Sequence, residues 1–219
     1  KNIDFDACMA KEIDGLLHNI ENQDGIDLRN GCHDIMISDI TGGTGDDLIA
    51  LTAIAGPEEY LPGGSLGSTH VLHNDWTRRD KNIHNVLIRN VKGYSKGGIC
   101  FHIRLLAVET KIWNVVIDGV IDTSPEGFYS GGGLLLGEQD GAYGSNRPDS
   151  ISRITVSNML CDSSNAILVN GYVANSVISN VMNNNPAASA IRVCREGGLK
   201  NVVLNGICTV GEKIIDEDF

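Results

Sequence analysis

Three aspartates stand at matching places in two neighbouring stretches of the chain. Asp24 lies in residues 22–25 (NQDG), and Asp46 and Asp47 lie in residues 45–47, each group directly before a short apolar run. If these runs are stacked parallel strands, about 4.8 Å apart, the three carboxyl groups form one cluster. Their mutual repulsion then raises the pKa of at least one group. An acid and a base become available together, as hydrolysis of a glycosidic bond requires.

The alternative interpretation is that these aspartates are turn residues. Asp is common at bends because its carboxylate accepts hydrogen bonds from nearby backbone N–H groups. Each carboxylate would then contribute to stability and none to catalysis. Three acids in register on adjacent coils favour the catalytic interpretation more than a single Asp would.

A seven-residue pattern that recurs along the chain indicates what positions these acids. It reads Asn or a substitute, aliphatic, any residue, aliphatic, two polar residues and a final aliphatic. The alternating aliphatic residues predict a strand with one buried face. Copies begin at Asn2, Asp34, Asn85, Asn114, Arg153, Asn175 and Asn201.

A second apolar run follows each copy, at 25–28, 48–51, 98–101, 133–136, 166–169, 190–193 and, incomplete, 213–215. The second and fourth residues of the complete runs are apolar and share one face, because strand side chains alternate. One such unit cannot bury its own apolar face, so the units must stack. We therefore predict an all-β fold: a single-stranded, right-handed parallel β-helix of about seven coils, forming one domain over residues 1–219.

Two long insertions, 55–82 and 123–150, interrupt the predicted coils. The first carries His70, His73 and Trp76. Long loops on a solenoid often form its binding surface, and aromatic side chains offer flat faces to sugar rings. The alternative is that the insertions only shield a sheet edge.

The first 21 residues predict either an incomplete first coil or a capping segment, because the chain begins inside a repeat. Solenoids need polar caps over their terminal coils. A partner chain or oligomer is one candidate cover. The other is residues 9–20, whose apolar residues have the spacing of a short amphipathic helix folded back on the coil.

Charge and composition exclude several classes of partner. The net charge of -11 argues against nucleic acid or an anionic membrane surface. No apolar run is long enough to span a membrane. The six cysteines have no CxxC or metal-ligand spacing, so we expect neither a metal nor a cofactor. Most of them fit core positions, although one pair bridging two coils remains open.

Two motifs resemble those of the polygalacturonase-like glycoside hydrolases (family 28), in the pectate-lyase-like β-helix group. Residues 22–27 (NQDGID) are similar to the family's NTDGID, and residues 45–51 (GDDLIAL) are similar to its DDxIAI. By this resemblance, Asp46 is the general acid, and Asp24 and Asp47 position the attacking water as general base. The resemblance covers residues 20–55 closely and is architectural elsewhere.

The sequence departs from the family at two further motifs. Lys96 or Gly97 stands where the family's GHG motif has His, and the apolar run 134–136 replaces the RIK motif that binds the sugar carboxylate. Residues from the adjacent coil and the first insertion are the candidate substitutes. The predicted substrate-binding residues are Asn22, His70, His73, Trp76, Lys96, His102 and Arg104.

The sequence thus predicts an extracellular or cell-surface glycoside hydrolase that cleaves a polysaccharide with inversion. The alternative is a non-catalytic β-helix, either a carbohydrate-binding module or a structural segment of a larger extracellular or spike assembly. A lyase or epimerase is disfavoured, because such β-helices commonly need Ca²⁺ or a basic Arg or Lys that is not evident here.

Overall fold

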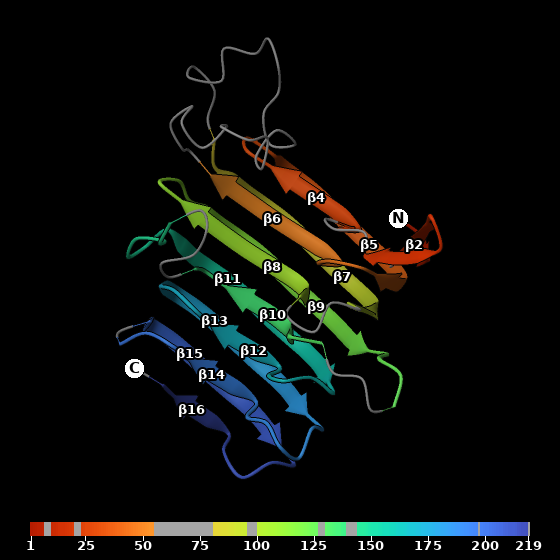
Figure 1. Cartoon of the computed structure of the whole chain (residues 1–219). Coiled ribbons are helices and arrows are strands. Elements are labelled where there is room, and N and C mark those ends of the chain that lie inside the picture. Colours follow the sequence, from red (N-terminus) through yellow and green to blue (C-terminus); the bar gives the residue numbers. More distant parts are fainter. Residues whose placement is uncertain are drawn as a thin grey trace.

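The computed structural model describes residues 1–6, 10–19, 23–54, 81–95, 100–126, 130–138, 144–196 and 198–218. Within these ranges the chain forms strands and turns without any helix, so none of the described segments is a helix able to cross a membrane. Most of the strands belong to two parallel seven-stranded sheets, shown in Figure 1. The prediction of an all-β fold is therefore confirmed.

The two sheets take alternate strands from the chain. In spatial order the first sheet consists of β1 (Ile3–Asp6), β5 (His33–Thr44), β7 (Ile83–Ser95), β9 (Ile112–Asp122), β11 (Ile151–Cys161), β13 (Val173–Asn183) and β15 (Leu199–Thr209). The second consists of β4 (Ile26–Arg29), β6 (Ile49–Ile54), β8 (Phe101–Val108), β10 (Gly132–Leu136), β12 (Ile167–Val169), β14 (Ile191–Val193) and β16 (Ile215–Glu217). This alternation is consistent with a parallel β-helix or solenoid.

Left-handed backbone conformations explain the spacing of the repeated pattern. The first and sixth residues of a copy have positive φ, for example 56° at Asp34 and 61° at Asp39. Asn, Asp and Gly tolerate this conformation best, which accounts for their recurrence at these places. The extra residue at the sixth position also breaks strict alternation. The aliphatic residue that follows, Ile40 in this copy, is thereby fully buried.

The Asn and Asp side chains at these bends also form hydrogen bonds from coil to coil. Asn85 Nδ2 donates to Asp34 Oδ1 at 2.8 Å, and Asn114 Nδ2 donates to Asn85 Oδ1 at 3.0 Å. A similar bond of 2.7 Å joins Asn201 to Asn175 near the other end of the sheet. An amide has both a donor and an acceptor, so identical side chains can form such a ladder.

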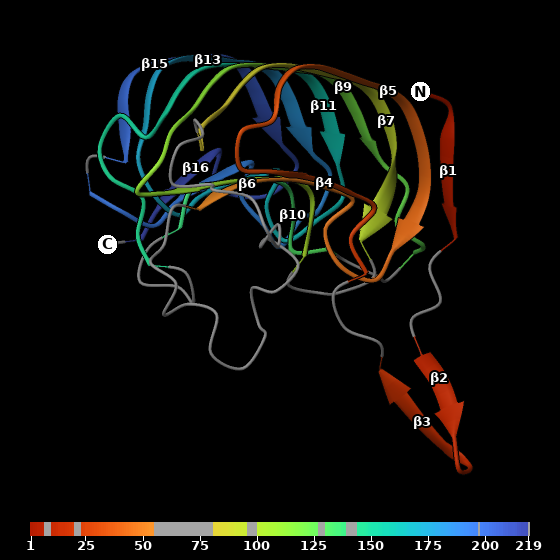
Figure 2. The same cartoon turned by 90° about the horizontal axis from the view of Figure 1, so that it is seen from above.

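The core lies between the two sheets, as the pattern predicts. Fully or almost fully buried positions include Ile37, Val86, Ile88, Val115, Ile117, Ile154 and Val156. Ile35, Val202 and Leu204 are partly buried and pack against this core. They lie on β5 and β15, close to the two ends of the first sheet, where fewer strands cover them. Figure 2 shows the two sheets facing one another.

The structure corrects the predicted register of the third short strand. Residues 98–101 were expected to form it, but β8 begins at Phe101 and runs to Val108. Its residue Ile103 pairs with Ile49 on β6 and with Leu134 on β10. The apolar alternation continues through β8, and this longer alternation decides the register.

The end strands are also displaced from their predicted register. Ile3, the second residue of the first copy, pairs with Ile40, the seventh residue of the second copy. The predicted register would pair it with the second residue of that copy, Ile35. On the last strand, Ile215 pairs with Ile191, which is one residue later than the predicted run implies.

Residues 10–19 form an antiparallel hairpin, which corrects the expectation of a short helix. Strands β2 (Ala10–Ile13) and β3 (Leu16–Asn19) are joined by Asp14 and Gly15, both with positive φ. Asp-Gly is a preferred pair for this two-residue turn. In Figure 2 the hairpin extends away from the two large sheets. A partner chain over the first coil stays a prediction.

Substitutions at Asn114 test the role of the left-handed bends. Asn114→Ala should lower the free energy of unfolding by about 1–3 kcal/mol, because Ala strains at positive φ and cannot bond to Asn85. Asn114→Gly loses the same hydrogen bond without the strain, so it should cost less. Chemical denaturation measures both. Equal losses would show that the backbone conformation is not what selects Asn.

Candidate functional site

Strand register brings Asp24, Asp46 and Asp47 together on neighbouring coils. Ile26 pairs with Ile49, and Asp24 and Asp47 each stand two residues earlier. The turns are also bonded directly, since Gly25 N–H donates to Asp47 O at 3.0 Å and Asp46 N–H donates to Gln23 O at 3.2 Å. The three residues therefore lie together at the N-terminal ends of β4 and β6, in the turns that lead into these strands.

Asp47 is buried and held by two donors from the next coil. Phe101 N–H donates to its Oδ1 at 2.7 Å, and Arg104 Nη1 lies 3.3 Å from its Oδ2. Burial raises the pKa of Asp47 to about 6, although Arg104 and the Phe101 N–H both act to lower it. A carboxyl with this pKa is part-protonated near neutral pH.

Asp24 is half-buried and has no hydrogen-bond donor for its carboxyl group within the described ranges. Burial raises its pKa to about 7, and the charges of Asp27, Asp46 and Asp47 raise it further, against a small opposing effect of Arg29. Asp24 therefore holds a proton more readily than an exposed Asp. Burial is the largest cause of this shift, and the charges of Asp46 and Asp47 act in the direction that the sequence spacing predicts.

Asp46 is close enough to both groups for its charge to raise their pKa values, and it is fixed by the turn that carries it. Its Oδ1 accepts the N–H of Asp47 at 2.9 Å. Its backbone carbonyl accepts the hydroxyls of Thr44 at 2.7 Å and Ser95 at 2.8 Å. Because Ser95 belongs to the next coil, the turn is tied on both sides. Bonds of this kind are what the turn-residue interpretation also expects.

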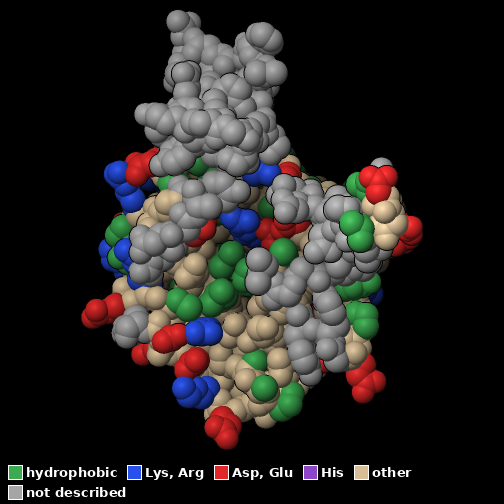
Figure 3. Space-filling model, in the orientation of Figure 1, with side chains coloured by type: hydrophobic (Ala, Val, Ile, Leu, Met, Phe, Trp, Pro, Cys, Tyr) green, Lys and Arg blue, Asp and Glu red, His purple; other side chains and the backbone are tan. Residues whose placement is uncertain are grey.

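A pocket of about 300 Å³ opens beside Asp46 and Asp47. Arg104 spans it, with Nη2 lying 3.8 Å from Glu138 Oε2. Figure 3 shows acidic and basic side chains next to one another on this face, beside a group of hydrophobic ones. The lining consists of Asp46, Asp47, Cys100, Phe101, Arg104, Leu135, Glu138 and Asn170. It combines charged groups with amide and apolar surface, as small-molecule sites do.

Cys100 stands level with Asp46 and forms a cluster with the acids. One donor atom from each of Asp46, Asp47 and Cys100 lies within 4.8 Å of the others. Such spacing would suit a cation, but burial and the two carboxylates raise the pKa of Cys100 to about 12. The thiol is then protonated, and metals bind the thiolate. A cation bound by these three groups would therefore have to displace the thiol proton.

His102 lies in the interior and not in the pocket. Its Nε2 is 2.7 Å from Gly93 O and its Nδ1 is 3.1 Å from Gly132 O, so both ring nitrogens face carbonyl acceptors. Both must therefore donate, and the ring carries a positive charge opposite Asp122, 3.4 Å away. Asp122 and the carbonyls raise the pKa of His102 against the effect of burial. Its place indicates a structural role beneath the site.

Two of the predicted substrate-binding residues lie within the described ranges, and of these Arg104 lines the pocket and His102 does not. Asn22, His70, His73, Trp76 and Lys96 lie outside the described residues, so their roles stay predictions. The sequence analysis missed the other lining residues, which are Cys100, Phe101, Leu135, Glu138 and Asn170. The missed signal was the register of β8, because pairing Ile103 with Ile49 puts Cys100 level with Asp46.

The thiols give no evidence of a link between coils. Cys32, Cys100, Cys161, Cys194 and Cys208 are all free, and Cys8 lies outside the described residues. Cys161 is fully buried in the core, and burial raises its pKa, so it behaves as a small apolar residue. Cys32 is partly buried and packs against the core, as the core-packing interpretation predicts, whereas Cys208 is exposed and Cys100 lines the pocket.

Comparisons of the chain with protein-family models, with curated proteins and with solved structures find no match. Arguments about function therefore rest on the geometry and electrostatics of the site itself. The resemblance of residues 20–55 to polygalacturonase-like enzymes remains an expectation from two short motifs.

The raised pKa values predict how stability depends on pH. The ordinary value of an Asp is 3.8, so the folded protein binds these protons more tightly than the unfolded chain does. The contribution to stability is complete below about pH 4 and is lost as the pH rises through 6 to 7.

Asp24→Asn, which removes the charge, should therefore be more stable than the wild type at pH 8. We expect a gain on the order of 1 kcal/mol, after allowance for solvent screening of a half-buried group, and little difference at pH 4. Asp14→Asn, at an exposed position in the turn between β2 and β3, is the control. Thermal unfolding across this pH range measures the effect. A gain that does not vary with pH would contradict it.

Proposed function

We propose that the protein is a glycoside hydrolase that cleaves a polysaccharide by inverting acid–base catalysis. The observation that carries this proposal is the cluster of Asp24, Asp46 and Asp47, in which two carboxyls have pKa values of about 7 and about 6. Such a cluster supplies a proton donor and a charged base at the same pH. The adjoining pocket provides room for a sugar ring.

Asp24 is the member best suited to donate the proton to the glycosidic oxygen. It has the highest pKa of the cluster members with a raised value, it is half-buried, and its carboxyl has no hydrogen-bond donor within the described ranges. Asp46 then accepts a proton from the attacking water. The family resemblance implies a different assignment, with Asp46 as the acid and Asp24 and Asp47 as the base. Kinetics of the two single variants distinguish these assignments.

Asp47 and Arg104 have supporting roles in this proposal. Asp47 is fixed by Phe101 N–H and Arg104, so it keeps the turn and the charge of the cluster in place. Arg104 and Glu138 reach the pocket from β8 and from the residues after β10, where they meet sugar hydroxyls. Leu135 offers an apolar surface to one ring face.

The proposal extends to the finer features of the fold. Seven strands in each sheet support about seven coils. Parallel strands of one sheet are nearly always joined by right-handed crossovers, which supports a right-handed helix. We propose that the protein acts outside the cell or at its surface, where polysaccharides are accessible. β1 and β15 are edge strands of the first sheet and are the places for a partner chain to pair.

A non-catalytic role is the second candidate, and one observation favours it. The carboxylates of Asp46 and Asp47 accept the N–H groups of Asp47 and Phe101, so both side chains already contribute to the turns. A carbohydrate-binding module, or a structural segment of a larger extracellular assembly, would need these bonds and no proton transfer.

Release of reducing ends from a panel of acidic and neutral polysaccharides tests the proposal. The wild type should hydrolyse at least one, with activity falling as the pH rises through about 7, because the acid then loses its proton. Asp24→Asn and Asp46→Asn should each lower kcat by about 100-fold or more, and Asp14→Asn, in the exposed turn between β2 and β3, should change it little.

An aryl glycoside with a good leaving group separates the two catalytic roles. Such a substrate needs no proton donor, so it should restore activity to the variant that lacks the acid and not to the one that lacks the base. We expect restoration in Asp24→Asn. Restoration in Asp46→Asn would support the assignment implied by the resemblance. No hydrolysis of any glycan would support the non-catalytic role.

A further inference from the structure

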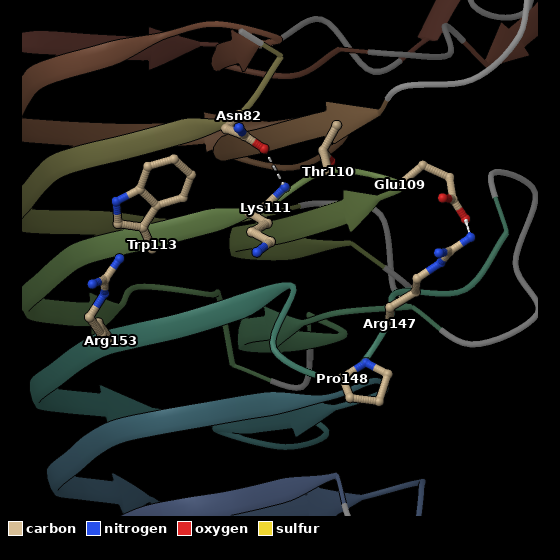
Figure 4. Close-up of a pocket in the computed structure, with 8 residues that line it drawn as sticks. All are labelled: Asn82, Glu109, Thr110, Lys111, Trp113, Arg147, Pro148 and Arg153. Atoms are coloured by element: carbon tan, nitrogen blue, oxygen red, sulfur yellow. Dashed lines mark hydrogen bonds and ion pairs between the residues drawn. The ribbon is translucent and has the colours of Figure 1, made fainter.

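A second pocket lies at the opposite end of the second-sheet strands from the acids. Its volume is about 570 Å³, within the range of small-ligand sites. It is formed where the chain leaves β8, enters β9 and approaches β11, and Figure 4 shows its side chains. The lining consists of Asn82, Glu109, Thr110, Lys111, Trp113, Arg147, Pro148 and Arg153.

A column of stacked rings ends in this pocket. His33, His84 and Trp113 are paired in register on β5, β7 and β9. The two imidazole centroids are 5.1 Å apart, and His84 is 4.5 Å from Trp113, with nearly parallel planes in both pairs. The next residue in register is Ser152 on β11. The chain thus places a small side chain where a fourth ring would continue the column.

Cations surround the end of the column. Among the described residues that line the pocket, the cations are Lys111, Arg147 and Arg153, and the one carboxylate is Glu109, which pairs with Arg147 at 2.6 Å. Neither Lys111 nor Arg153 has an acidic partner among the described residues. In Figure 4, Lys111 lies between Trp113 and the Arg147–Glu109 pair. This concentration of positive charge is unusual in a chain of net charge -11.

We propose that this pocket binds an acidic saccharide, with one pyranose ring against Trp113 and its carboxylate or sulfate on Lys111 and Arg153. A sugar ring has an apolar face that fits an indole, and Lys and Arg form charge-assisted hydrogen bonds with both anionic groups. The choice of a saccharide over other ring-bearing anions rests on the proposed hydrolase function. The site holds the polymer at a distance from the acids and takes no part in bond cleavage.

Isothermal titration calorimetry with hexasaccharides of uronic acid, sulfated sugar and neutral glucose tests this site. We expect the uronate or the sulfated hexamer to bind the wild type and the neutral one to bind much more weakly. The double variant Lys111→Ala, Arg153→Ala should weaken binding by about tenfold or more, as expected when two charge-assisted contacts are lost. Which acidic hexamer binds identifies the anionic group.

A matched double variant, Arg89→Ala with Lys92→Ala, removes two exposed cations from β7 on the same sheet and should change affinity less than about twofold. Asp24→Asn should bind like the wild type, so loss of hydrolysis and loss of binding can be told apart. The proposal is overturned if no acidic hexamer binds at millimolar concentration, if both double variants lose affinity equally, or if an oligothymidylate binds more tightly than either acidic saccharide.

Discussion

In-register stacking of parallel strands is the constraint on which the rest of this structure depends. Each strand lies about 4.8 Å from its neighbour, so a residue meets its equivalent from the coils before and after. A side chain is therefore selected mainly by how well it packs against similar side chains. Left-handed residues such as Asp39 keep this register, because they return the next aliphatic residue to the core after two polar positions.

The same stacking has opposite consequences for different polar groups. Amides stack favourably, as in the bond from Asn114 to Asn85, because each has a donor and an acceptor. Carboxylates accept only, and they repel one another at this spacing. The stack accommodates Asp24 and Asp47 by raising their pKa values and by placing Arg104 on the following coil. Burial is the main cause of the raised pKa values of Asp24, to which we assign proton donation, and of Asp47, and repulsion from neighbouring carboxylates adds to it.

The buried His102–Asp122 pair beneath the site is also stabilised by the groups that stacking places around it. His102 stands in register with apolar or small residues of other coils, and it is accepted there because two carbonyls and Asp122 satisfy its charge. A buried pair of this kind is costly to break, since either partner alone would be left uncompensated. The pair links β8, which carries His102, to the last residue of β9, Asp122. His102 follows Phe101 in the chain, and the N–H of Phe101 donates to Asp47.

Much of this fold was predictable from the sequence because its signal repeats. The inward positions of β7, β9 and β11 follow from alternation within each copy, and the meeting of Asp24 with Asp47 follows from two equivalent strand starts. Features that occur once were missed. The apolar residues of segment 9–20 have helical spacing, so they predict a helix where Asp14 and Gly15 form a hairpin turn. The apolar run 98–101 predicts a strand, although β8 begins only at Phe101. The place of His102 depends on acceptors far along the chain, which no local pattern reveals.

Titration of the aspartate carboxyl carbons by ¹³C NMR tests the central claim most directly. The claim is that stacking places Asp24 and Asp47 in one cluster that holds protons near neutral pH. Assigned spectra of the wild type should show pKa values of about 7 for Asp24 and about 6 for Asp47. The exposed Asp34, whose hydrogen bonds to Asn85 and His33 lower its pKa, should titrate well below both. Titration of Asp24 and Asp47 at about 4, like isolated aspartates, would contradict the account.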